Sequence, residues 1–321
     1  MSPRPSDPPV TIIASALLPL FLAEQAPALT QAWQAAWSTP HHPGLMAVRQ
    51  ARLIQRHVLP EHSPCTPHEW AYAQALHWPA APDLLPFAAH SAAQRGLSCP
   101  PDHGWAFMDA VHWEVSQGQV HLRSAAVVTP EEDQTIWQAV QPYMEEDGIH
   151  LHPLGGGRWL AHATHFKQLP SVSLARVLGH DVAYWLDPDS VAAQSPAQRL
   201  LRRLQNEMQM LLYTHTLNDK RATPINSFWW SGTGDLPVQN SPTQVVLNTD
   251  LQTSFATQDP QAWGTQWLHL ADTVMAAALQ AGHQLVLCGE DRSICLQAPP
   301  HGLWQGLKNL LPRPALKELL S

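Results

Sequence analysis

Short apolar runs recur along the chain and predict β-strands. Residues 10–18 form the first run, which we expect to be a buried strand. Two further buried strands are expected at residues 225–230 and 244–247. Pairs of runs joined by glycine-containing turns predict three hairpins. These pairs are residues 105–115 with 119–123, 149–152 with 158–161, and 283–288 with 293–297.

Apolar residues spaced three and four apart predict helices in the rest of the chain. The clearest pattern follows Ser195-Pro196, where Leu201, Leu204 and Met208 fall on one stripe. Thr129-Pro130 is a second strong start signal, since a hydroxyl cap precedes proline and acidic residues. The predicted helices cover residues 24–38, 45–58, 68–77, 130–147, 196–217, 260–281 and 302–320.

These elements predict a mixed α/β fold that leans towards α+β. Hairpins imply antiparallel pairs, so we expect a mixed, partly antiparallel sheet with helices packed on it. The N-terminal third is predicted to be mostly helical. We therefore divide the chain into a mainly helical region, residues 1–100, and a mixed α/β core region, residues 101–321.

Composition narrows the classes of partner. The formal net charge is −8, and Arg199, Arg202 and Arg203 form the one basic cluster. We interpret that cluster as a solvated helix face, because a nucleic-acid surface needs many clustered cations. Neither nucleic acid nor membrane is an expected partner.

The first apolar segment and the cysteines bear on location. Residues 10–22 are too short to span a bilayer and contain Pro19, so we favour a buried strand over a signal peptide. The four cysteines show no metal-binding spacing, and Cys288 and Cys295 are expected to be reduced thiols across a hairpin. These features favour a cytoplasmic protein.

Polar residues near the predicted helix 196–217 suggest a pocket. Asn206 and Gln209 lie on one face of that helix, which is equally compatible with a solvated surface. The strand that begins near Asn226 ends in Ser231-Gly232-Thr233-Gly234, whose backbone N–H groups are able to hold an anion. An ordinary tight turn is the favoured interpretation of this segment, and an anion site is the alternative.

Histidines and acidic residues offer weaker candidates. His150 with His152, and His162 with His165, have spacings that a metal ion accepts, although surface imidazoles are the favoured interpretation. Asp109 and His112 form a possible acid–base pair. They fall on opposite faces of a regular strand, so a bulge would be needed to bring them together.

Several segments occur together in an order that resembles a known family. They are Asp102–Trp105, Asp109–Trp113, Thr129–Glu132, Asp147-Gly148, Gly157–Leu160, Asn206–Leu212 and Ile225–Gly234. In this order they resemble the RpfE-type regulatory proteins of proteobacteria, which are often described as cofactor-independent phosphoglycerate mutase-like. The resemblance covers residues 100–235. Two departures are Ala110 in place of proline and Thr233 in place of glycine.

The resemblance implies either regulation or phosphotransfer. A mutase of the alkaline-phosphatase type needs two metal ions held by Asp and His clusters, and that machinery is not visible here. We therefore expect a regulatory or ligand-binding protein without catalytic activity, cofactor or metal, which binds an unknown small molecule or protein. A mutase-like phosphotransfer enzyme and a protein-interaction scaffold using Trp33 or Trp37 are the alternatives. The candidate pocket residues are Asn206, Glu207, Gln209, Asn226, Ser227, Trp229, Gly232, Gly234, Asp109 and His112.

Overall fold

The chain folds into two compact units in this computed structural model. The first unit contains Met1–Glu61, Thr66–Trp78 and Gln239–Ser321, and the second contains His62–Cys65 and Pro79–Val238. The units do not follow chain order, because the second is inserted between distant parts of the first. The structure describes residues 10–18, 27–78, 81–116, 119–124, 127–178, 180–186, 195–236, 243–252, 254, 257 and 259–299.

The first unit is built on a mixed five-stranded sheet. Its strands are β1 (Val10–Leu18), β2 (Arg52–Val58), β8 (Gln244–Asn248), β9 (Gln284–Gly289) and β10 (Arg292–Gln297). Their order is β2-β10-β9-β1-β8. Strand β1 runs parallel to β8 and β9, whereas β10 is antiparallel to β9 and β2.

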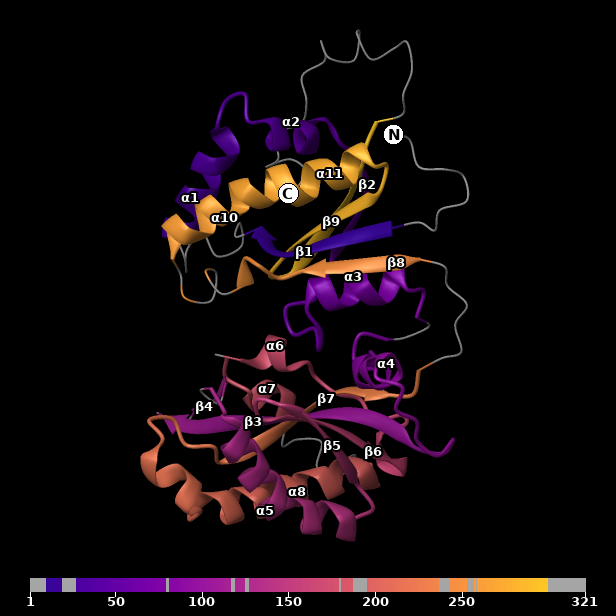
Figure 1. Ribbon diagram of the computed structural model, residues 1–321, viewed down its shortest axis with the longest axis vertical. Helices are drawn as coiled ribbons and strands as arrows, with labels where there is room; N and C mark the ends of the chain where they lie inside the picture. Colours follow the sequence, from indigo (N-terminus) through magenta and orange to yellow (C-terminus); the bar gives the residue numbers. More distant parts are fainter. Residues whose placement is uncertain are drawn as a thin grey trace. The chain divides into compact units, whose positions relative to one another are not determined.

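Helices cover both faces of this first sheet (Figure 1). One face carries α1 (Pro27–Ser38), α2 (Pro43–Gln50), α10 (Pro260–Leu270) and α11 (Ala276–Gln280), and the other carries α3 (Pro67–Ala75). A π-helical turn, Ala271–Met275, joins α10 to α11. Successive side chains of β9 point to opposite faces of the sheet. Leu285 and Leu287 pack with the larger helical layer, whereas Val286 and Cys288 pack with α3.

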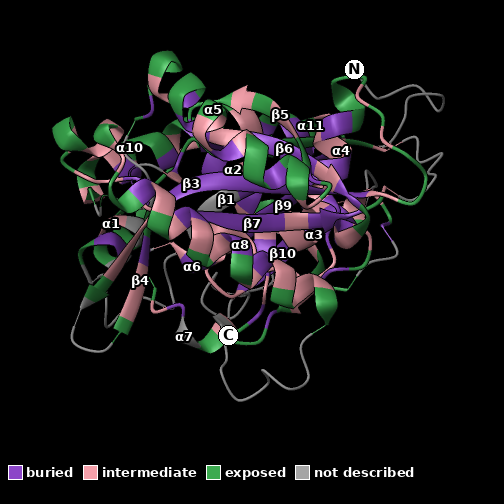
Figure 2. Cartoon of the chain, turned by 90° about the horizontal axis from the view of Figure 1, so that it is seen from below, coloured by how far each residue is buried: buried purple, intermediate pink, exposed green. Residues whose placement is uncertain are grey.

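The second unit is built on an antiparallel sheet around one long strand. Its strands are β3 (Gly104–Ser116), β4 (Gln119–Ser124), β5 (His150–Gly155), β6 (Arg158–Ala163) and β7 (Ser227–Gly234). Trp105 of β3 pairs with both His162 of β6 and Gly234 of β7, so β6 and β7 lie on opposite edges of β3. Strand β7 is thus the outer strand on its side, and most of β3, β6 and β7 is buried (Figure 2).

Two helical layers enclose the second sheet. Helices α5 (Pro130–Glu146) and α8 (Pro196–Tyr213) lie on one face, and α4 (Phe87–Gln94), α6 (Leu174–Val177) and α7 (Ala183–Leu186) lie on the other (Figure 1). Thr129 and Ser195 cap α5 and α8 through complete capping boxes with Glu132 and Gln198. Short 3₁₀ turns, Thr164–Phe166 and Thr216–Lys220, connect these elements.

The mixed α/β fold and all three predicted hairpins are confirmed. The mostly helical N-terminal third is not confirmed, because β1 and β2 lie within it. The helix predicted over residues 45–58 is wrong in its second half, where α2 ends at Gln50 and β2 begins at Arg52. The strand partner of β2 is β10, about 240 positions later in the chain, so no local pattern reveals it. The helix predicted at 302–320 lies outside the described residues.

Three further observations concern the location and scaffold hypotheses. Among the described residues, no helix combines the length and apolar character needed to cross a bilayer. All four cysteines are free thiols. Trp37 is half-buried against Trp267 at 6.1 Å between ring centroids, and Arg49 lies over its ring, so it offers little open surface to a partner.

Candidate functional site

A pocket in the second unit lies between α8 and the outer edge of β7. It has a volume of about 160 Å³. The walls come from the segment 169–172, from Trp185 of α7, from α8 and from β7. The lining residues are Leu169, Pro170, Ser171, Val172, Trp185, Gln198, Leu201, Arg202, Gln205, Trp229 and Trp230.

Hydrogen bonds fix these walls to β7. The Thr233 hydroxyl donates to the Leu169 carbonyl, and the Thr233 N–H donates to Ser171 Oγ at 3.3 Å. The Trp229 indole N–H donates to the Val172 carbonyl at 2.8 Å. From the other side, Gln205 Nε2 donates to the Phe228 carbonyl at 3.1 Å and ties α8 to the same strand. Strand β7 is therefore hydrogen-bonded to both walls of the pocket, the segment 169–172 and α8.

Three tryptophans and an arginine are among the lining residues. Trp229 and Trp230 are consecutive on β7 and pack on opposite faces of the sheet, Trp230 towards α8 and Trp229 on the other side, while Arg202 supplies positive charge. The indole N–H of Trp185 is buried and has no hydrogen-bond partner among the described residues. A buried donor of this kind is satisfied in most proteins.

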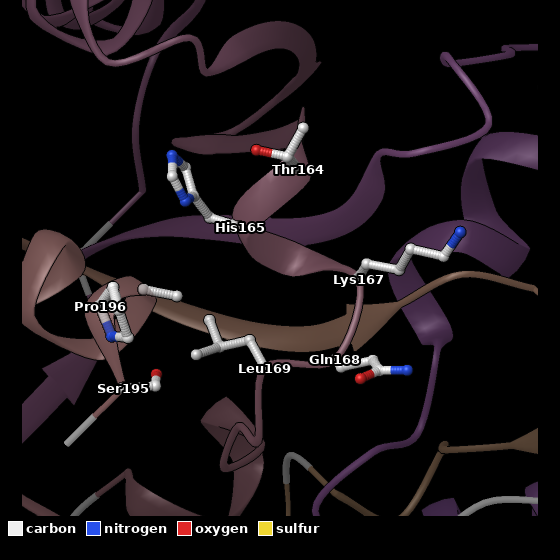
Figure 3. A pocket seen from close by; sticks show the side chains of 8 residues that line it. Thr164, His165, Lys167, Gln168, Leu169, Ser195 and Pro196 are labelled. Carbon is white, nitrogen blue, oxygen red and sulfur yellow. The ribbon is translucent and has the colours of Figure 1, made fainter. Parts of the chain in front are cut away.

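A second, shallower hollow adjoins the first at Leu169 (Figure 3). It has a volume of about 530 Å³ and lies beside the first turn of α8, at Ser195 and Pro196. Its Lys167 side chain extends away from α8 in Figure 3, donates to the Pro101 carbonyl at 2.7 Å and lies 3.7 Å from Asp235. The Lys167 ammonium group already interacts with these protein oxygens, so we take the smaller pocket as the better candidate for a ligand site.

The residues predicted on the outer strand take different positions. Trp229 lines the pocket. Asn226 instead bonds to the backbone of Trp113 on β3, through its Oδ1 at 2.7 Å and its Nδ2 at 3.0 Å. Ser227 is fully buried, and its hydroxyl has no hydrogen-bond partner among the described residues.

The two glycines of the predicted pocket have structural reasons to be glycine. Gly232 has φ +63°, and a Cβ there would lie 3.0 Å from Phe107 and 3.2 Å from the backbone N of Ala88. Gly234 has φ +134° and packs against Pro86 in the same way. Both positions therefore let α4 approach β7 closely.

The residues predicted on α8 do not line the pocket. Asn206 is exposed, and Glu207 lies 3.8 Å from Arg203 on the same helix. Gln209 is half-buried on α8. The pocket instead uses the preceding turns, where Gln198, Arg202 and Gln205 lie.

Asp109 and His112 are not brought together. Strand β3 is regular between them, and the His112 ring Nδ1 lies 2.9 Å from the Pro224 carbonyl. Asp109 is buried and pairs with Arg158 at 3.0 Å, while the Arg158 guanidinium lies 4.0 Å from the Phe107 ring centroid. Burial raises the pKa of Asp109 to about 6, and the Arg158 charge opposes that shift. Asp109 Oδ2 has no partner among the described residues.

The sequence did not indicate most of the pocket. Trp185 belongs to the four-residue helix α7, and the segment 169–172 is a loop, so neither is long enough to show periodicity. Arg202 belongs to the basic cluster that we interpreted as a solvated helix face, whereas it lines the pocket. Neither Trp185 nor Arg202 is marked by the residues around it in the sequence, because the pocket forms only when α8 packs beside β7.

The histidines with metal-compatible spacing occupy a separate place. His150, His152 and His162 lie together on β5 and β6. In the part of the chain that the structure describes, no group of three or more His, Cys, Asp or Glu side chains is arranged to hold a metal ion.

Comparison with known proteins adds two distant structural similarities. No family model matches the chain, and no curated protein matches it. The PH0037 protein of Pyrococcus horikoshii superposes with a TM-score of 0.41 and 10% identity, covering 91% of this chain and 88% of that one. The cofactor-independent phosphoglycerate mutase of Thermoplasma acidophilum gives a TM-score of 0.32 and 11% identity, covering 92% and 91%. Similarities at this level carry no conclusion about this chain, and none of the comparisons supports the RpfE-type family.

Proposed function

We propose that this chain is a ligand-binding protein whose second unit binds a small aromatic carboxylate between α8 and β7. The observation that carries the proposal is the pocket lined by three tryptophans and Arg202. A cavity of about 150 Å³ is large enough for a single benzene ring. The pocket volume of about 160 Å³ therefore fits a one-ring ligand.

The polar groups of the pocket indicate which polar group the ligand carries beside its ring. A guanidinium pairs best with a planar oxyanion such as a carboxylate. An aromatic acid fits this lining, because its ring packs on apolar tryptophan surface and its carboxylate pairs with Arg202. Binding without turnover fits the regulatory role implied by the sequence resemblance.

The proposal is tested with the full chain labelled with 5-fluorotryptophan and observed by ¹⁹F NMR. Sodium benzoate and other one-ring aromatic carboxylates are added, with cyclohexane carboxylate and inorganic phosphate as comparisons. We expect the signals of Trp185, Trp229 and Trp230 to move with the aromatic acids, while those of Trp263 and Trp267 in the first unit stay fixed. Signals that stay fixed at all three pocket tryptophans would reject the proposal.

The mutase-like alternative has its own direct test. Purified protein is assayed for interconversion of 3- and 2-phosphoglycerate with added Mn²⁺. Our proposal predicts no turnover. Turnover that survives substitution of the pocket residues would replace ligand binding with phosphotransfer as the function.

A further inference from the structure

Four histidines and a tryptophan gather at the β5–β6 end of the second sheet. His150 of β5 pairs directly with His162 of β6, which pairs directly with Trp105 of β3. Because side chains alternate along a strand, His152 lies on the same face as His150. His103 enters from the segment before β3. The cluster therefore joins three separate pieces of backbone.

His162 lies at the centre of this histidine cluster. Its Nδ1 lies 3.0 Å from His103 Nδ1. Its ring centroid lies 4.9 Å from that of His150, 5.3 Å from that of His152 and 5.1 Å from that of Trp105. A hydrogen bond between two imidazole nitrogens requires one donor and one acceptor. The contact between His103 and His162 is consequently lost when both rings carry a proton on each nitrogen.

The surroundings of His162 give no compensating negative charge. Burial, followed by the neighbouring charges of His152, His150 and His103, lowers the pKa of His162 to about 4. Burial and the His150 charge likewise lower the pKa of His152. Packing thus disfavours protonation of His162 and His152, so these two rings take up protons more readily when the cluster opens.

Other charged groups lie on the neighbouring elements. Asp102 is adjacent to His103 in the chain, and Asp235 lies 3.7 Å from Lys167. On α4, which covers Trp105, His90 lies 3.0 Å from Gln94. The charged groups that act on His162 are thus all imidazoles.

We propose that this histidine cluster is a pH-sensitive latch that holds the β5–β6 hairpin against the segment before β3 and releases it in mildly acidic solution. Each proton that enters the cluster adds a positive charge beside other imidazoles, whereas the opened hairpin exposes those charges to water. The inference is independent of ligand binding, because the cluster shares no residue with the pocket between α8 and β7.

The test is hydrogen exchange of the full chain, measured by mass spectrometry between pH 7 and pH 5 and corrected for the intrinsic exchange rate. We expect the protection of residues 97–105 and 149–163 to fall by up to about tenfold per pH unit below about pH 6.5 for one proton taken up on opening. The protection of α10 in the first unit serves as the internal reference. Equal protection of these segments across the pH range would overturn the latch.

Two variants decide whether His162 causes the effect. His162→Gln should reduce the pH dependence to the part that His152 contributes, whereas His121→Gln on β4 of the same sheet should leave it intact. A pH dependence that persists unchanged in His162→Gln would contradict the proposal. If His162→Gln does not fold, His150→Gln is used in its place, because His150 is exposed. His150→Gln must then reduce the pH dependence for the proposal to stand.

Discussion

The side-chain amide of Asn226 forms two hydrogen bonds with the backbone of Trp113. Its Oδ1 accepts from the Trp113 N–H at 2.7 Å, and its Nδ2 donates to the Trp113 carbonyl at 3.0 Å. Asn226 stands just before β7, where the backbone pairing of β7 with β3 ends at Ser227 and Val111. The side-chain amide thus makes the two hydrogen bonds that a backbone peptide group of a paired strand would make. Asn226 therefore has a structural role and does not contact a ligand.

We predict that Asn226→Ala destabilises the second unit by about 2 kcal/mol. The substitution leaves both backbone groups of Trp113 without these bonds, and each lost bond costs about 1 kcal/mol. Urea unfolding followed by tryptophan fluorescence measures the change. Asn206→Ala is the control, because Asn206 is exposed on α8 and should change the unfolding free energy by less than about 0.5 kcal/mol. Equal effects of the two substitutions would contradict this role of Asn226.

The β5–β6 turn allows a matched pair of glycine substitutions. Gly156 has φ +66° with open space around it, whereas Gly157 has φ +79° and a Cβ there would lie 2.9 Å from Val128. We expect Gly156→Ala to cost about 1 kcal/mol from backbone strain alone. Gly157→Ala should cost about 3 kcal/mol, since overpacking adds to the strain. Thermal unfolding of both variants measures the difference, and a Gly157→Ala cost no larger than that of Gly156→Ala would be inconsistent with the tight packing.

The raised pKa of Asp109 predicts that the free energy of unfolding depends on pH. Its pKa is raised from 3.8 to about 6 in the folded protein, so the folded state keeps a proton that the unfolded chain has already lost. Stability from this group therefore falls as pH rises between about 4 and 6. Asp109→Asn cannot titrate, and the wild-type stability relative to this variant should fall by at most about 3 kcal/mol across that window.

Urea unfolding at a series of pH values tests the Asp109 prediction. The histidine cluster acts in the opposite direction, because the lowered pKa of His162 makes stability rise with pH between about 4 and 6.5. Comparing wild type with Asp109→Asn cancels that contribution. A difference between the two proteins that does not change with pH would show that Asp109 titrates normally.

Local sequence signals predicted much of the fold. The caps at Thr129 and Ser195 and the three hairpins depend on residues close together in the chain, so they are readable without the structure. Strand β2 was missed because its partner β10 lies far along the sequence and its own residues alternate only weakly. Contacts across the sheet override local propensity at such a place.

The candidate site was less readable than the fold. The sequence indicated the neighbourhood of α8 and β7, and Trp229 does line the pocket there. Arg202 and Trp185 were missed because the sequence around a charged helix residue, or around a tryptophan in a four-residue helix, is the same whether or not a pocket lies beside it. Their roles depend on how α8, α7 and segment 169–172 pack around one strand.

The measurement that tests ligand binding most directly compares two arginines on α8. Arg202 lines the pocket, whereas Arg203 lies outside it and pairs with Asp147. The affinity for sodium benzoate is measured by calorimetry for the full-length wild type, Arg202→Gln and Arg203→Gln. We predict that Arg202→Gln weakens binding about tenfold, equivalent to about 1.4 kcal/mol, and that Arg203→Gln binds as the wild type does. Binding that is absent from the wild type, or equally strong in all three proteins, would contradict the account.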